Sequence, residues 1–175
     1  MKTIFHRLGR KIYKTQTRYL PVGLDLVADI NKIYPNLGQI KTIFDVGANI
    51  GQTARHFYKS FPNANILSFE PIKETFDELH YNTEKLNRVS CFNHALGNIN
   101  ESRKIYLKEK SNLNSLVEDI MPISENYDIV NVKTIDEFCE NNDIENIDIL
   151  KTDTEGWDLN VIQGAIAALN RSQQI

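Results

Sequence analysis

The amino-acid sequence predicts one α/β domain built on a mostly parallel β-sheet. Short apolar, β-rich runs alternate with segments of helical periodicity, which is the pattern of a parallel sheet covered by helices. The chain has 175 residues, enough for a single sizeable core. Its 41% hydrophobic and 25% charged residues are typical of an ordinary globular protein, and its net charge of -3 gives no reason to expect nucleic-acid binding.

Residues 1–38 are expected to form a basic, helical lead-in, and residues 39–175 the main domain. The first 18 residues contain no acidic side chain and six basic ones: Lys2, Arg7, Arg10, Lys11, Lys14 and Arg18. This pattern is typical of a solvated helix face; the alternative is peripheral contact with an anionic membrane or another polyanion. Apolar residues then recur at helical spacing from Val22 to Ile33, and Pro35 ends the run.

The expected compartment is the cytoplasm. No apolar run reaches the roughly 18 residues that span a bilayer, and the start of the chain lacks the continuous apolar core of a signal peptide. Cys91 and Cys139 are far apart in the sequence, which favours two free thiols over a disulfide framework.

The first half of the main domain contains two predicted strand–helix units. "IKTIFDV", residues 40–46, is apolar and β-rich like a buried parallel strand. The helix after it has an apolar face from Ala54 to Phe61, and Pro62 stops it. A second strand, "NILSFE", ends at Glu70, and Pro71 suits the first turn of the next helix.

The second half is predicted to add four strands and two helices. "VSCFNHAL" is expected to be a third strand, and "RKIYL" and "DIVNVKTI" two more. A short helix follows over residues 135–140, and "NIDILKTD" is a strongly apolar strand. The last helix is expected to bury a face of large apolar residues, namely Leu159, Ile162, Ile166 and Leu169.

Polar residues gather where the predicted strands end. In a parallel α/β sheet the ligand lies at the carboxyl ends of the strands. This rule selects four segments: residues 45–51, Glu70, residues 94–98 and residues 153–158.

The first of these segments is a glycine turn between a strand and a helix. Gly47 and Gly51 let the backbone approach a ligand closely, and Asp45 can accept a hydrogen bond from a donor or cationic group. Glu70 ends the next strand, where an acid can accept hydrogen bonds from both hydroxyls of a ribose. The structural alternative is a pair of turn glycines with a surface carboxylate. The combination of Asp45, the glycine turn and Glu70 at the end of the next strand favours a nucleoside site.

The turn does not match a dinucleotide site. Such sites usually show G-x-G-x-x-G, whereas Asn49 here stands where a central glycine is expected and a third glycine is missing. Asp45 would also repel a pyrophosphate. S-adenosylmethionine, with a sulfonium, an amino-acid end and no phosphate, fits better, and a nucleotide-dependent oxidoreductase is the disfavoured alternative.

Four motifs carry a resemblance to a known family. "DVGANIGQTA", "SFEP", "ALGN" and "ILKTDTEGWDLNVIQGA" resemble the motifs of the FkbM family of S-adenosylmethionine-dependent methyltransferases, from about Ile40 to Ala165. The resemblance implies a class I methyltransferase fold, a Rossmann-like three-layer sandwich, and methylation of a hydroxyl on a glycan or small metabolite. It also implies that Asp45, Gly47, Asn49 and Gly51 line the methionine end of the cofactor, that Glu70 holds the ribose, and that His94 and Ala95 flank the adenine.

Asp153 and Glu155 are the candidate catalytic residues. In the family fold they follow the strand that ends beside the transferred methyl group. Either can act as the base that removes the acceptor's proton, a role that typically contributes 10²–10⁴-fold to the rate, or can bind sugar hydroxyls. A divalent metal on these two acids is thinly supported. The structural alternative is that Asp153 caps the following helix and Glu155 lies in its first turn.

The class I fold normally continues with further strands beyond the helix that ends near "NRSQQI". We therefore expect a C-terminally truncated chain whose last strands are missing. The expected function is an S-adenosylmethionine-dependent O-methyltransferase, and the alternative is a non-catalytic binding module that keeps the cofactor fold.

Overall fold

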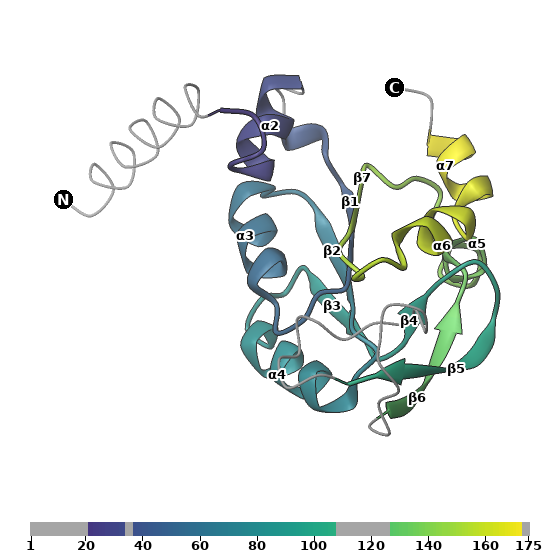
Figure 1. Cartoon of the computed structure of the whole chain (residues 1–175). Coiled ribbons are helices and arrows are strands. Elements are labelled where there is room, and N and C mark those ends of the chain that lie inside the picture. Colours follow the sequence, from purple (N-terminus) through teal and green to yellow (C-terminus); the bar gives the residue numbers. More distant parts are fainter. Residues whose placement is uncertain (1–20, 34–36, 108–126, 173–175) are drawn as a thin grey trace. The chain divides into compact units, whose positions relative to one another are not determined.

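Figure 1 shows the computed structural model of the chain, which describes residues 21–33, 37–107 and 127–172. The chain divides into two units, Met1–Gln39 and Ile40–Ile175. The first contains helix α2 (Leu26–Ile33) and the 3-10 helix η1 (Leu37–Gln39). Asp25 precedes α2, and its Oδ1 accepts a hydrogen bond from the backbone N–H of Ala28 at 2.8 Å. The basic segment 1–18 lies outside the described residues.

The second unit is built on a four-stranded sheet in the order β3-β2-β1-β7. Its strands are β1 (Thr42–Val46), β2 (Asn65–Phe69), β3 (Val89–Phe92) and β7 (Ile149–Thr152). All three pairings are parallel. The sheet therefore confirms the predicted α/β class, and the carboxyl ends of β1, β2 and β7 lie at one edge.

A three-stranded sheet in the order β4-β6-β5 stands beside it. Its strands are β4 (Ala95–Leu96), β5 (Glu101–Tyr106) and β6 (Tyr127–Lys133), with β4 parallel and β5 antiparallel to β6. The prediction of one strand over "VSCFNHAL" was wrong, because the chain changes sheets at Asn93 and His94. Asn93 holds this corner, since its Nδ2 donates to the carbonyls of Glu70 and Pro71, each at 2.9 Å.

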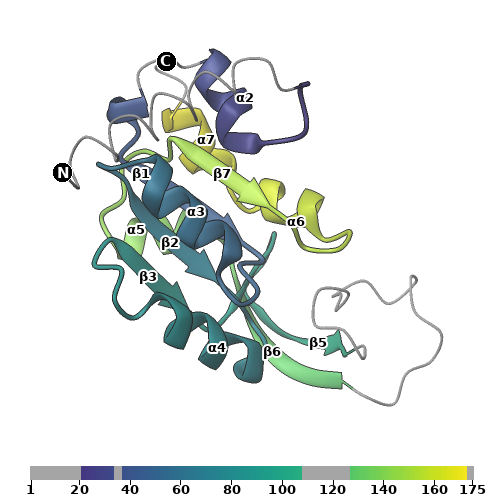
Figure 2. The same cartoon turned by 90° about the vertical axis from the view of Figure 1, so that its left-hand side faces the viewer.

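Helices cover both faces of the four-stranded sheet. On one face, α3 (Gln52–Ser60) contacts β2 and α4 (Lys73–Thr83) contacts β3 (Figure 2). The other face is covered by α5 (Ile135–Asn141), whose Phe138 ring lies 5.0 Å from Phe69 and 4.9 Å from Phe92 in edge-to-face contacts. This layered arrangement is a Rossmann-like fold.

The last predicted helix is two helices, α6 (Asp158–Gln163) and α7 (Ile166–Ser172). The predicted buried face was largely wrong: Leu159, Ile162 and Ile166 are exposed, whereas Val161, Ala165 and Ala168 are buried. The reason is a close backbone contact. A Cβ on Gly164 would lie 1.9 Å from the carbonyl oxygen of Gly97, so only small residues suit the inner face there. Among the described residues no helix is long and apolar enough to cross a membrane.

Candidate active site

The turn between β1 and α3 places every second residue in the left-handed backbone region. Gly47, Asn49 and Gly51 have φ values of 71°, 47° and 87°. Asparagine tolerates this region better than most side chains, so Asn49 serves where the dinucleotide pattern has glycine. The turn also bends onto the end of β2, because the N–H groups of Gly47 and Ala48 both donate to the carbonyl of Phe69, at 3.1 and 3.0 Å.

Gly47 is also the point where the turn touches the end of β7. A Cβ at this position would lie 2.1 Å from the carbonyl oxygen of Asp153. The N–H of Asp153 donates to the carbonyl of Val46 at 3.1 Å, which continues the β1–β7 pairing by one residue. The two motifs "DVGANIG" and "DTEG" are therefore in direct backbone contact, and the glycine is what permits it.

Glu70 is buried at the end of β2 and binds the turn. Its Oε2 accepts from the N–H of Asn49 at 3.0 Å, and its Oε1 accepts from the N–H of Ile72 at 3.1 Å. Burial raises the pKa of this carboxyl to about 7, although the two backbone hydrogen bonds act in the opposite direction. A carboxylate oxygen can accept more than one hydrogen bond, so both oxygens keep capacity for a ligand's hydroxyl groups.

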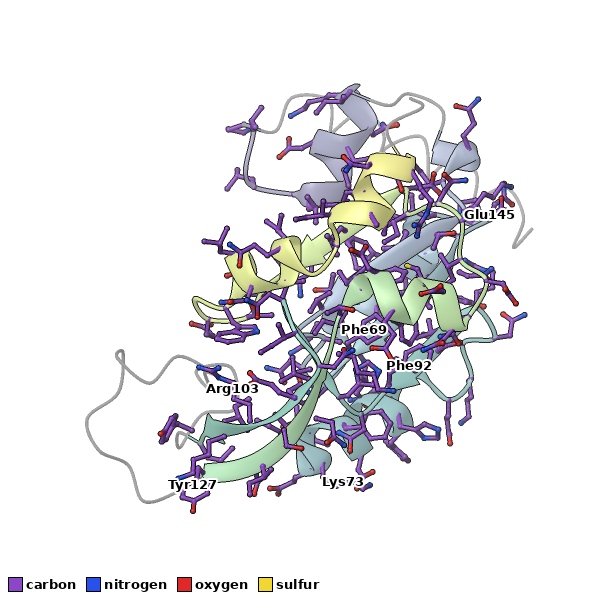
Figure 3. All side chains as sticks on the ribbon, turned by 90° about the vertical axis from the view of Figure 1, so that its right-hand side faces the viewer. Phe69, Lys73, Phe92, Arg103, Tyr127 and Glu145 are labelled. Carbon is purple, nitrogen blue, oxygen red and sulfur yellow. The ribbon has the colours of Figure 1, made fainter. Side chains whose placement is uncertain are left out.

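His94 lies among aromatic rings at the start of β4. Its ring centroid is 5.4 Å from that of Phe69 and 5.8 Å from that of Phe138. Figure 3 shows Phe69 and Phe92 in the interior of the domain. Burial lowers the pKa of the imidazole, so the ring is neutral near pH 7, and Nδ1 lies 3.1 Å from the carbonyl oxygen of Ala95. Because a carbonyl only accepts, this contact assigns the proton to Nδ1 and leaves Nε2 as an acceptor.

The loop after β7 keeps both candidate catalytic acids out of the helix. The N-cap of α6 is Trp157, so Asp153 is not the cap and Glu155 is not in the first turn. The carboxylate that closes the loop is Asp158, whose Oδ1 accepts from the N–H and the hydroxyl of Thr154 at 3.2 and 2.9 Å. Glu155 has a left-handed φ of 49°, a conformation that is uncommon for this residue type and that occurs often at functional sites.

These segments surround one cavity at the carboxyl edge of the four-stranded sheet. It contains seven of the predicted site residues, namely Gly47, Asn49, Glu70, His94, Ala95, Asp153 and Glu155. Val46, Leu96, Thr154 and Trp157 also line it and lie within the segments selected from the sequence, whereas Phe69, Pro71, Ile72 and Ile105 lie outside those segments. Three of the described lining residues carry carboxyl groups and none is a lysine or arginine, so the site suits a ligand with cationic and hydroxyl groups. Lys151, which is not among the lining residues, lies 3.8 Å from Asp153.

Trp157 lines the cavity and packs against the second sheet. Its side chain is 5% exposed and belongs to the hydrophobic core. The guanidinium carbon of Arg103, on β5, lies 4.4 Å from the centre of the indole ring, a cation–π contact. Trp157 is therefore both a cavity wall and a packed aromatic residue.

Two predicted cofactor residues do not line the cavity. Gly51 lies at the N-cap of α3, against Leu79 and Thr83. Asp45 is completely buried, and its Oδ1 is 3.0 Å from the Nζ of Lys151 on β7. Lys151 was not predicted from the sequence, because its role depends on the register of the parallel β1–β7 pair, in which it is the direct partner of Asp45.

The fold and the cavity at its strand ends define a Rossmann-like α/β protein with a ligand site at the carboxyl edge of its sheet. A family model, the methyltransferase FkbM domain, matches residues 45–175. The chain therefore belongs to the FkbM methyltransferase family, as its motifs predicted.

Two relatives illustrate the likeness. "Methyltransferase 1" of Beauveria bassiana (strain ARSEF 2860) is 28% identical over 142 residues, which cover 70% of this chain and 57% of that protein. "2-O-methyltransferase NoeI" of Sinorhizobium fredii (strain NBRC 101917 / NGR234) is 25% identical over 147 residues, which cover 76% of this chain and 60% of that protein. The chain thus spans less than two thirds of the length of either relative.

Proposed function

We propose that the chain binds S-adenosylmethionine and transfers its methyl group to a hydroxyl of a glycan or small metabolite. The observation that carries the proposal is the chemistry of the cavity wall, where Glu70, Asp153 and Glu155 bring three carboxyl groups together and the described lining includes no lysine or arginine. A sulfonium and an ammonium are favoured by such a wall, whereas a pyrophosphate is repelled. Gly47 brings the turn directly against the backbone of Asp153, so both motifs border the same cavity.

The lining residues would bind different parts of the cofactor. Glu70 would accept hydrogen bonds from the ribose hydroxyls, and His94 and Ala95 would flank the adenine. Gly47 and Asn49 would contact the methionine part. When bound, the cofactor supplies an electrophilic methyl group on sulfur.

A hydroxyl acceptor is supported by a relative's name and by one carboxylate. NoeI is named a 2-O-methyltransferase. The side chain of Asp153 is 69% exposed, so an incoming molecule can reach it. Asp153 or Glu155 would hold the acceptor oxygen in line and take its proton, and alignment is the larger of these two contributions.

The proposal includes a cytoplasmic site of action and an acceptor that is not nucleic acid. Cys91 and Cys139 are free thiols, as expected in a reducing compartment. Contact of the basic segment 1–18 with an anionic membrane is a proposal that rests on sequence alone.

We expect S-adenosylhomocysteine to bind in roughly the micromolar range and NAD at least about a hundredfold more weakly, because a pyrophosphate would face three carboxyl groups. Isothermal titration calorimetry with both ligands checks this. A dissociation constant for S-adenosylhomocysteine above about 1 mM, or equal affinity for NAD, would contradict the proposed cofactor.

If Asp153 is the base, Asp153→Asn is expected to lower turnover by about 10²–10⁴-fold and to leave S-adenosylhomocysteine affinity within about threefold. Glu155→Gln is the matched comparison, because it neutralises the neighbouring acid. Transfer of labelled methyl to a mixture of glycans and hydroxylated metabolites provides the measurement. Unchanged turnover in one variant removes that residue as the base, and cofactor binding without any transfer by the wild-type chain would favour the non-catalytic binding module.

A further inference from the structure

A row of polar side chains runs across the sheet directly beneath the glycine turn. Lys151, Asp45, Ser68 and Cys91 are register partners on β7, β1, β2 and β3, so they project from the same face of the sheet. At the end of this row, the Lys151 side chain is 12% exposed and that of Asp45 is not exposed at all. The ion pair between them is therefore shielded from water, and neither charge is free for long-range attraction of a ligand.

Lys151 also holds the backbone of the turn. Its Nζ donates to the carbonyl of Gly47 at 3.0 Å and to the carbonyl of Val46 at 3.3 Å. The same ammonium lies 3.8 Å from Oδ2 of Asp153. The Lys151 ammonium therefore has four partners. Asp45, Val46 and Gly47 lie at the end of β1 and the start of the turn, and Asp153 lies in the loop after β7.

The turn is therefore held from two sides, by an ammonium group and by a carboxyl group. Lys151 binds carbonyl oxygens at its first residues, and Glu70 binds the N–H of Asn49 two residues later. The ammonium group binds carbonyl oxygens and the carboxyl group binds an N–H. Together these contacts set the orientation of the peptides that face the cavity.

We propose that Lys151 is a positioning residue of the cofactor site, and that Asp45 is its buried counter-ion and not a direct ligand of the cofactor. The link to the cofactor rests on the proposed function. The competing interpretation is a buried ion pair that serves stability alone.

The test uses the double variant Asp45→Leu/Lys151→Met, because removing only one partner leaves a buried charge and risks unfolding. Replacing both charges with apolar groups of similar size is often nearly neutral for stability. The double variant also loses the hydrogen bonds from Lys151 to the backbone carbonyls, as a variant of Lys151 alone would. Lys85→Met is the control, since Lys85 is 90% exposed.

Amide hydrogen exchange of the unliganded proteins is the first measurement. In the double variant we expect exchange at Ala48 and Asn49 to accelerate at least about tenfold relative to Ile66, whose N–H is bound within the sheet to the carbonyl of Arg88. The ratio separates local loosening of the turn from a global loss of stability. Equal acceleration at the turn and at Ile66, or none at the turn, would overturn the positioning role.

Calorimetry with S-adenosylhomocysteine is the second measurement, and we expect at least about a tenfold loss of affinity in the double variant and none in Lys85→Met. Wild-type affinity in the double variant would assign Asp45 and Lys151 to stability alone. If the wild-type chain itself does not bind, the proposed function fails, while the exchange ratio still decides whether Lys151 orders the turn.

Discussion

Between pH 5 and pH 8 the unliganded protein is expected to become less stable while its affinity for S-adenosylmethionine increases, because both trends follow the ionisation of Glu70. This carboxyl is 6% exposed, and burial raises its pKa to about 7 from an ordinary value of 4.5. Only the ionised form is a strong acceptor for ribose hydroxyls. The ionised form is also the one that burial penalises.

The sign follows from proton binding in the two states. Between the ordinary pKa and the raised pKa, folded Glu70 keeps its proton and unfolded Glu70 loses it, so stability falls as the pH rises and levels off above the folded pKa. For a pKa of about 7 in the folded state, the contribution lost between pH 5 and pH 8 is about 2 to 3 kcal/mol.

Chemical denaturation of the wild type and Glu70→Gln across this pH range checks the prediction. The difference between the two proteins reports Glu70 together with its coupling to Asp45 and Lys151, because the contribution of His94 is shared and cancels. Glu78→Gln, an exposed site on α4, serves as the control. A difference between the wild type and Glu70→Gln that does not change with pH would contradict the assignment, as would a ligand affinity in Glu70→Gln equal to that of the wild type.

Gly47→Ala is expected to destabilise the protein by about 2 to 5 kcal/mol and to abolish measurable cofactor binding. An alanine here must adopt a left-handed backbone, which costs about 1–2 kcal/mol. Its Cβ would also lie 2.1 Å from the carbonyl oxygen of Asp153, so the turn or the end of β7 must shift. Thermal unfolding and ligand calorimetry measure the two effects.

Two other glycines provide matched controls. Gly23→Ala isolates the backbone term, because Gly23 has a φ of 94° and, among the described residues, no heavy atom lies within 4 Å of the place its Cβ would take. Gly164→Ala isolates the clash, since its Cβ would meet the carbonyl of Gly97 at 1.9 Å without a left-handed φ, and Gly164 does not line the cavity. If Gly47→Ala binds ligand as well as Gly164→Ala does, the turn is not part of the binding surface.

Much of the fold could be predicted from the sequence because it depends on local patterns. The apolar run at β1, the helical spacing of α3 and Pro62 specify a strand, a turn and a helix without reference to the rest of the chain. The cavity also follows from a general rule, since residues at the carboxyl ends of parallel strands must converge. Glu70, Asp153 and Glu155 were placed in this way, and they do share one cavity.

The missed features depend on contacts between distant segments. Lys151 gains its role only when β7 pairs beside β1, and the strand pattern alone gives no register. The inner face of α6 and α7 was mispredicted because large apolar residues were favoured over small ones, whereas the Gly97–Gly164 contact brings the backbones together. The split of "VSCFNHAL" depends on Asn93, whose bonds to the end of β2 were not visible in the periodicity.

The position of β1 between β2 and β7 has a consequence for synthesis on the ribosome. β2 follows β1 closely, but the other neighbour arrives late: Asp148, just before β7, binds the backbone of Lys41, 107 residues earlier in the chain. While the segment between β1 and β7 is being synthesised, one edge of β1 has no strand partner and its apolar residues are not fully covered. Nascent chains in this condition associate with one another or with chaperones. The same long-range pairing that builds the cavity therefore makes the emerging polypeptide most vulnerable just before β7 leaves the ribosome.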